Sequence, residues 1–285
     1  MSPLHAHPLA IVFTSGRADY SATPRHRHTP DTPPASRRGR RRPGRTLLAT
    51  GAAVAFFGSI AAACGSDEAK GPSTASCDAA VSYASSFATA PQDPAEFGPF
   101  IQDQLLPLVE TMTSGFSGDA ATAAATLRDT LHQVAEAGDP SALESPSAVE
   151  ARTTVFQTVH EDCDVERVDV QAVDWAFANV PDEIHSGRVS FAVDYAGADE
   201  HEMVVFRRND GVTESLDELM ELPGDEMMGK VTMTGVTWGS PGSHSYLPAD
   251  LEPGTYFLLC FLPQHGDEDG MPHFMVGMRH TLEVV

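Results

Sequence analysis

The last third of the chain is rich in side chains that bind soft or borderline metal ions, among them His201, Cys260, His273 and Met278. One thiolate, two imidazoles and a weakly bound thioether suit copper in both of its common oxidation states, so little has to rearrange when one electron is gained or lost. A ligand role would also explain why Cys260 is left over when the other cysteines are assigned below. Donors of these types would suit a mononuclear copper site if the fold brought the four side chains together.

Each of these residue types also has an ordinary structural interpretation. A histidine can lie at a strand edge, a cysteine can be a small buried apolar side chain, and a methionine can fill a gap in a core. The stretch Phe261–Pro272 separates Cys260 from His273 and could hold that imidazole too far away. In that case His265, within the stretch, is a competing ligand.

Residues 165–285 must position these side chains, and their pattern is that of β-strands. β-Branched and aromatic residues recur at strand spacing at 168–177, 189–195, 203–206, 231–238, 254–261 and 278–285. A short helical insert is expected at about 213–222. Short strands separated by turn signals predict a Greek-key β-sandwich.

The end of the chain resembles the cupredoxins, the plastocyanin and azurin class of blue copper proteins. The run Pro253–Tyr256 leads a strand into Cys260, and the pair Gly277-Met278 precedes a last strand, with His273 upstream of it. The resemblance covers about 120 residues and none of the preceding chain. It implies that His201 and His273 supply imidazoles, Cys260 the thiolate and Met278 the axial thioether, and that the protein transfers electrons.

Two features depart from the cupredoxin pattern. Simple members of that family have only two residues between the cysteine and the second histidine, whereas here the acidic insert 261–272 intervenes. The residue after the upstream histidine is usually an asparagine that links the two ligand loops, and here it is Glu202.

Residues 76–163 are rich in Ala and Leu and predict four helices, at about 76–89, 93–114, 119–137 and 146–161. Four antiparallel helices would form a four-helix bundle with the start of the first and the end of the fourth at one end. Cys77 and Cys163 lie at those two positions and could form a disulfide. His132 and His160 show no ligand pattern, and we interpret both as surface or capping residues. The chain is thus expected to be an α+β protein with a helical domain, 76–163, and a cupredoxin-like domain, 165–285.

Residues 1–64 have the pattern of a basic leader followed by a lipoprotein signal peptide. Arg37–Arg45 is a dense positive segment, Thr46–Ile60 is apolar, and small residues precede Cys64. This resembles a bacterial lipobox, in which Cys64 would be lipidated and residues 65–75 would be a polar tether. The alternative is a short membrane-spanning anchor, for which the apolar stretch is marginal. We expect export and a lipid anchor at the outer face of the cell membrane.

The charge distribution limits the possible partners. The chain has 18 Lys and Arg against 40 Asp and Glu, a formal net charge of −22. An acidic body argues against nucleic-acid binding, which needs a basic face, and favours a basic redox partner protein. The chain after Cys64 has no Gly-rich phosphate loop, zinc-protease motif or nucleophile elbow, so we expect no enzyme. The expected function is electron transfer or copper handling. The alternative is a metal-free binding or structural module with the same fold.

Overall fold

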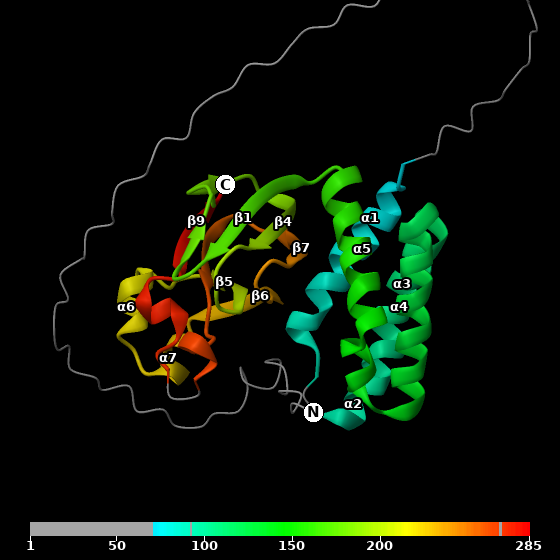
Figure 1. Ribbon diagram of the computed structural model, residues 1–285, viewed down its shortest axis with the longest axis horizontal. Helices are drawn as coiled ribbons and strands as arrows, with labels where there is room; N and C mark the ends of the chain where they lie inside the picture. Colours follow the sequence, from blue (N-terminus) through cyan, green and yellow to red (C-terminus); the bar gives the residue numbers. More distant parts are fainter. Residues whose placement is uncertain (1–70, 92, 268–269) are drawn as a thin grey trace, which may run out of the picture. The chain divides into compact units, whose positions relative to one another are not determined.

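The computed structural model describes residues 71–91, 93–267 and 270–285 (Figure 1). The signal peptide, Cys64 and most of the tether lie outside these residues, so the predictions for them stay predictions. All described residues belong to one compact unit. Within it, no helix has the length and apolar character needed to cross a membrane.

The helical part contains more elements than the four predicted helices. They are α1 (Thr74–Ser86), α2 (Pro94–Phe100), α3 (Leu106–Gly115), α4 (Gly118–Ala137) and α5 (Pro146–Asp162). A π-helical turn, Ile101–Leu105, joins α2 to α3, so the second predicted helix is not regular. Pro107 gives the physical reason, because its ring lacks an N–H and crowds the carbonyl of the preceding turn. The four-helix bundle is therefore not confirmed in the simple form that the sequence predicts.

Side-chain caps and glycine define the helix ends. Ser73 caps α1 and Asp93 caps α2, each accepting a hydrogen bond from a backbone N–H of the first turn. Gly138 ends α4 with a φ of 68°, a left-handed conformation that glycine adopts without strain. In Figure 1, α1, α3, α4 and α5 lie side by side, and contacts join α1 to α3, α3 to α4 and α4 to α5.

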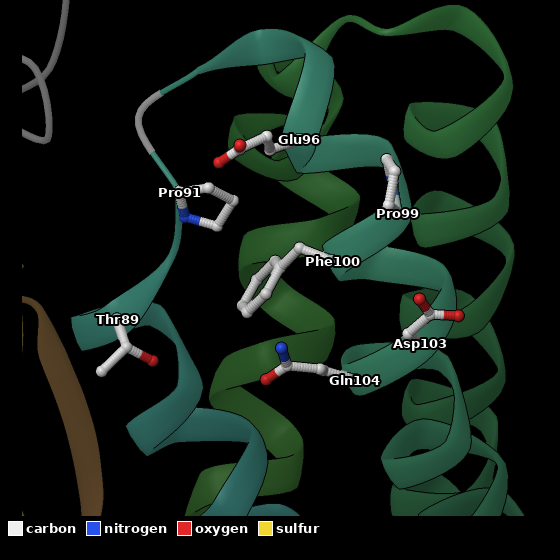
Figure 2. Close-up of a pocket in the computed structure, with 7 residues that line it drawn as sticks. All are labelled: Thr89, Pro91, Glu96, Pro99, Phe100, Asp103 and Gln104. Atoms are coloured by element: carbon white, nitrogen blue, oxygen red, sulfur yellow. The ribbon is translucent and has the colours of Figure 1, made fainter.

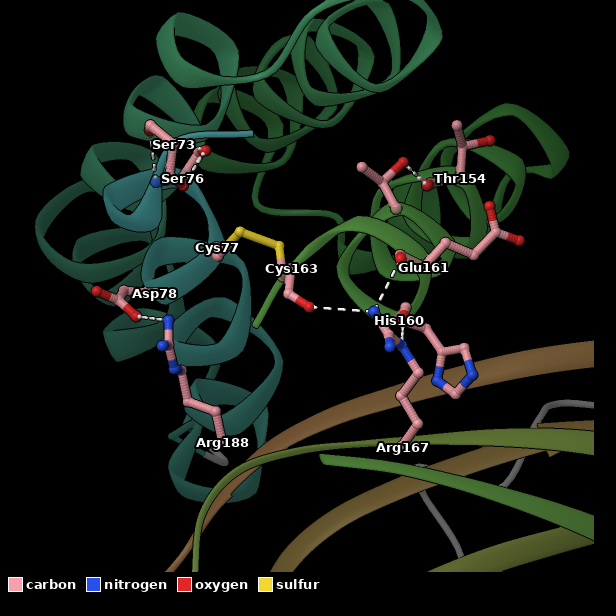
Figure 3. Close-up of a disulfide and its surroundings, with 11 residues drawn as sticks. Ser73, Ser76, Cys77, Asp78, Thr154, His160, Glu161, Cys163, Arg167 and Arg188 are labelled. Carbon is pink, nitrogen blue, oxygen red and sulfur yellow. Dashed lines mark hydrogen bonds and ion pairs between the residues drawn. A yellow bond between two sulfur atoms is a disulfide. The ribbon is translucent and has the colours of Figure 1, made fainter. Parts of the chain in front are cut away.

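The predicted disulfide between Cys77 and Cys163 is present. It joins α1 to the residue that follows α5, and both cysteines are buried (Figure 3). Beside it, Arg167 donates hydrogen bonds to the carbonyl oxygens of Glu161 and Cys163. The end of α5 is thus attached both to α1 and to the first strand of the sandwich.

Residues 166–284 form the predicted β-sandwich of two sheets. Its strands are β1 (Glu166–Val173), β2 (Ala176–Ala178), β3 (Glu183–Ile184), β4 (Gly187–Tyr195), β5 (His201–Arg208), β6 (Val231–Gly239), β7 (His244–Leu251), β8 (Gly254–Leu259) and β9 (Arg279–Val284). One sheet has the order β2-β1-β4-β7 and the other β3-β9-β8-β5-β6. The chain crosses between the sheets after β2, β3, β4, β6 and β7. Strand β1 runs parallel to β4.

Strand β5 is covered on both faces, which explains its uninterrupted apolar run. Its first six residues are buried. One face packs in the inter-sheet core, and the other packs against the helical insert, α6 (Leu216–Met220) and α7 (Gly224–Met228). Such burial on two sides fixes the position of the strand and therefore of its first residue, His201.

The helices also contact the sandwich, chiefly at β7. His160 of α5 is buried, with Nδ1 3.2 Å from the carbonyl oxygen of Ser190 in β4. The interpretation of His160 as a surface or capping residue was therefore wrong. Arg188 of β4 forms an ion pair of 2.7 Å with Asp78 of α1 (Figure 3).

Candidate metal centre

Three ends of neighbouring strands meet at one edge of the second sheet and carry the predicted ligands. β8 lies between β5 and β9 and is antiparallel to both. The start of β5, the end of β8 and the start of β9 therefore lie together. His201 is the first residue of β5, Cys260 directly follows β8, and Met278 directly precedes β9. All three are fully buried.

His201, Cys260 and His273 form a compact cluster of donor atoms. The Nδ1 atoms of the two imidazoles are 3.1 Å apart, and Cys260 Sγ lies 3.3 Å from His273 Nδ1. One donor atom from each residue lies within 4.8 Å of the others. Nitrogen and sulfur ligands on one ion at bond lengths of about 2.0–2.3 Å are themselves about 3–4 Å apart. The separations therefore fit three ligands of a single metal ion.

The insert between Cys260 and His273 folds back on itself and does not separate them. Pro263 and Pro272 pair in an antiparallel bridge. The N–H of His273 donates to Leu262 O at 2.9 Å, and the next N–H, of Phe274, donates to Cys260 O at 2.8 Å. His273 begins a short 3₁₀ turn, His273–Val276, and is fully buried.

His265, the competing ligand considered above, lies outside the cluster. Its side chain is exposed, and its Nδ1 lies 3.2 Å from a carboxylate oxygen of Asp199. The structure thus brings His273, and not His265, to Cys260.

Met278 is connected to the cluster through its backbone. Its N–H donates to His273 O at 3.0 Å, and its carbonyl accepts from the N–H of Cys260 at 3.3 Å. Its side chain is buried in the same apolar cluster as Cys260. The axial role of its thioether stays a prediction.

Glu202 forms the link between the two ligand segments that the resemblance assigns to an asparagine. Its backbone N–H donates to Cys260 Sγ at 3.4 Å, and its Oε1 accepts from the N–H of Phe261 at 2.9 Å. The side chain is buried, and this burial raises its pKa to about 7. A buried carboxyl group thus joins the two ligand segments at the position where the resemblance implies an amide.

Burial determines the protonation of the three donor groups. It raises the pKa of the Cys260 thiol to about 12. It lowers the pKa of His201, and it lowers the pKa of His273 to about 4 with a further contribution from His201. At neutral pH both imidazoles are therefore neutral and the free thiol is protonated. A metal ion would bind the neutral imidazoles and displace the thiol proton.

Sequence reasoning missed three side chains that contact the imidazoles. Asp174 Oδ1 lies 3.3 Å from His201 Nε2, and Asp199 Oδ2 lies 3.9 Å from His273 Nε2. The ring of Trp175 lies 4.7 Å from that of His273, edge to face. Asp174 and Trp175 lie within the strand predicted at 168–177, and the structure instead ends β1 at Val173 and begins β2 at Ala176. The sequence pattern therefore contains no sign of the turn that these two residues form.

A pocket of about 350 Å³ lies elsewhere, in the helical part beside α2 (Figure 2). Its polar side chains Glu96, Asp103 and Gln104 are all exposed. Exposed carboxylate and amide side chains are not held in one orientation by their neighbours, so we assign this pocket no binding or catalytic role.

No family model and no curated protein matches the chain. Solved structures that resemble it include two auracyanins and a rusticyanin. Auracyanin B has 21% identity over 42% of this chain and 88% of its own, with a TM-score of 0.28. Auracyanin from Roseiflexus castenholzii has 19% identity over 42% and 96%, with a TM-score of 0.28. Reduced rusticyanin has 16% identity over 42% and 78%, with a TM-score of 0.25.

The cupredoxin resemblance of residues 165–285 implies a sandwich of two sheets with ligands gathered at the ends of its strands. The structure has both features, including the buried cluster of His201, Cys260 and His273. The C-terminal part of the chain is thus a cupredoxin-like β-sandwich with a candidate metal centre at one edge.

Proposed function

We propose that the β-sandwich binds one copper ion and exchanges single electrons with a partner protein. The observation that carries this proposal is the convergence of Cys260 Sγ with Nδ1 of His201 and Nδ1 of His273 in a fully buried cluster. One anionic sulfur and two neutral nitrogens suit both the monovalent and the divalent ion, and the Met278 thioether would complete the set. The protein is in this view a carrier and not an enzyme.

Copper supplies the one-electron chemistry when bound, and the chain supplies a rigid and dry environment. The strands β5, β8 and β9 hold His201, Cys260 and Met278 at positions fixed by sheet pairing. The N–H of Glu202 donates to the sulfur and orients it. Because all these groups are buried, water is excluded and little solvent has to reorganise when the charge of the site changes.

The cellular setting is a second part of this proposal. Cys64 would carry a lipid that anchors the exported protein to the outer face of the cell membrane, as expected of a lipoprotein. A structural disulfide, Cys77–Cys163, supports export because disulfides persist in oxidising compartments. The net charge of −22 supports a partner with a basic face. Replacing Cys64 by Ser should release the protein from the membrane fraction, and unchanged membrane retention would refute the anchor.

Titration of the metal-free protein with divalent copper tests the metal assignment. We expect one equivalent to produce an intense thiolate-to-copper charge-transfer band in the visible. Cys260→Ser should abolish this band, whereas Met278→Leu should change the reduction potential and keep the colour. A protein that binds no copper would instead be the metal-free module, and the proposal would be withdrawn.

Copper handling is a second candidate function, supported by two exposed methionines on the loop between Cys260 and Met278. Met271 is 48% and Met275 is 42% exposed, and both flank His273 in the sequence. Thioethers favour monovalent copper. If handling is the function, the protein should bind one equivalent of monovalent copper and show no thiolate band after oxidation.

A further inference from the structure

A two-residue turn contacts both imidazoles of the candidate metal centre. β1 and β2 pair up to Val173 and Ala176, which leaves Asp174 and Trp175 as the turn. The carboxylate of Asp174 lies 3.3 Å from His201 Nε2. The ring of Trp175 lies 4.7 Å from the ring of His273 at an interplanar angle of 73°. One turn of the other sheet thus lies against the outer side of each imidazole.

The backbone of this turn is strained at Trp175, which has a φ of 68°. Glycine and asparagine adopt this left-handed conformation readily, whereas a bulky side chain rarely does. Strain of this kind persists where the surroundings impose it, and it is concentrated at functional sites. A β-carbon added at Gly277, beside Met278, would lie 3.1 Å from the carbonyl oxygen of Trp175. The turn therefore also packs against the segment between His273 and Met278.

A second loop, residues 196–199, is built around the carboxylate of Asp174. The N–H groups of Ala198 and Asp199 donate to Asp174 Oδ1 at 2.8 and 3.3 Å. A β-carbon at Gly197 would lie 2.3 Å from His201 Nε2 and 2.5 Å from Asp174 Oδ1. Only glycine fits there without separating this pair, so the local sequence accommodates the contact between Asp174 and His201.

We infer that the Asp174–Trp175 turn is the positioning element of the metal centre. Asp174 accepts the Nε2–H of His201, which selects the tautomer whose bare Nδ1 faces Cys260 and His273. Trp175 covers the His273 ring and keeps water from it. A carboxylate behind a ligating histidine fixes the ring and increases its basicity, and the apolar cover limits solvent access. The metal part of this inference rests on the proposed function, and the tautomer part does not.

The tautomer of His201 in the metal-free protein tests the role of Asp174 directly. Nitrogen chemical shifts of the imidazole in a two-dimensional NMR spectrum distinguish the Nε2–H and Nδ1–H forms. We expect the Nε2–H form in the parent protein and in Asp174→Asn, whose side-chain oxygen still accepts. Asp174→Ala should give a mixture or the other tautomer. The Nδ1–H form in the parent protein, or an unchanged tautomer in Asp174→Ala, would overturn the inference.

Copper binding tests the same residue in the loaded protein. Asp174→Ala should weaken copper affinity by about 10- to 100-fold, as loss of such a partner typically does. Asp174→Asn should retain affinity within several-fold and raise the reduction potential, because a negative charge beside the site is lost. Asp250→Asn and Asp250→Ala, at an exposed position of β7, are the matched controls and should change neither quantity. A site that binds no copper removes the proposed function, while the tautomer experiment still decides the role of Asp174.

Replacement of Trp175 separates its covering role from a purely structural one. Asparagine tolerates a positive φ, so Trp175→Asn relieves the strain and removes the cover. We expect this variant to be at least as stable to urea as the parent and yet to lose copper to an external chelator about tenfold faster. Trp175→Phe should retain most of the protection. A lower stability together with an unchanged release rate would show that Trp175 only supports the fold.

Discussion

The disulfide between Cys77 and Cys163 gives the prediction whose magnitude follows most directly from the structure. It closes a loop with a sequence separation of 86 residues. The loss of chain entropy in the unfolded state corresponds to about 4.6 kcal/mol for a loop of this length, and measured effects are usually somewhat smaller. We therefore expect Cys77→Ala/Cys163→Ala to reduce the free energy of unfolding by about 4 kcal/mol.

Urea unfolding of the metal-free protein, followed by far-UV circular dichroism, measures this loss. The parent protein unfolded with excess reductant is the first control and should show a similar loss. Cys260→Ala with reductant absent is the second, because it removes the third described cysteine and leaves the disulfide intact. A change below about 1 kcal/mol in both the double variant and the reduced parent would contradict this expectation, since it would mean that opening the loop adds little entropy to the unfolded chain.

Three further predictions concern the surroundings of the centre. Burial raises the pKa of Glu202 from 4.5 to about 7, so the folded state binds this proton more tightly than the unfolded state does. The free energy of unfolding of the metal-free protein should therefore fall by up to about 3 kcal/mol as the pH rises from about 4.5 to 7. The free energy of unfolding of Glu202→Gln, measured with urea across this pH range, should not show that decrease. The same pH dependence in the parent and the variant would contradict the assignment to Glu202. Burial raises the pKa of the Cys260 thiol from 9.0 to about 12, so its thiolate fraction at pH 8 is about 1000-fold lower than in the unfolded chain. Its reaction with iodoacetamide, followed by mass spectrometry, should be slower than in urea by about that factor, and equal rates would mean that the cluster opens readily. Finally, His265→Ala should leave copper affinity within about twofold in an equilibrium titration, and a tenfold loss would identify His265 as a ligand.

The sequence predicts the parts of the structure that depend on local pattern. Alternation of apolar residues indicates the strands, and Cys260 and Met278 follow from their places at strand ends. The helical segments were also predictable, but the π-helical turn before Pro107 was not, because it depends on how the backbone adjusts around a single proline.

The contacts that complete the site depend on tertiary structure and leave little trace in the sequence. The return of His273 to Cys260 depends on backbone hydrogen bonds within the 261–272 insert. Asp174 approaches His201 only because β1 and β5 lie in sheets packed face to face. The glycine at 197 that allows this approach looks in the sequence like an ordinary turn residue.

We propose that His201, Cys260 and His273 bind one copper ion. A crystal structure of the copper-loaded protein, with anomalous scattering measured at the copper edge, would locate that ion. We predict a single strong peak within bonding distance of Cys260 Sγ and of Nδ1 of both histidines. Copper found only at the surface, for example between His265 and Asp199, with the buried cluster empty, would contradict the claim.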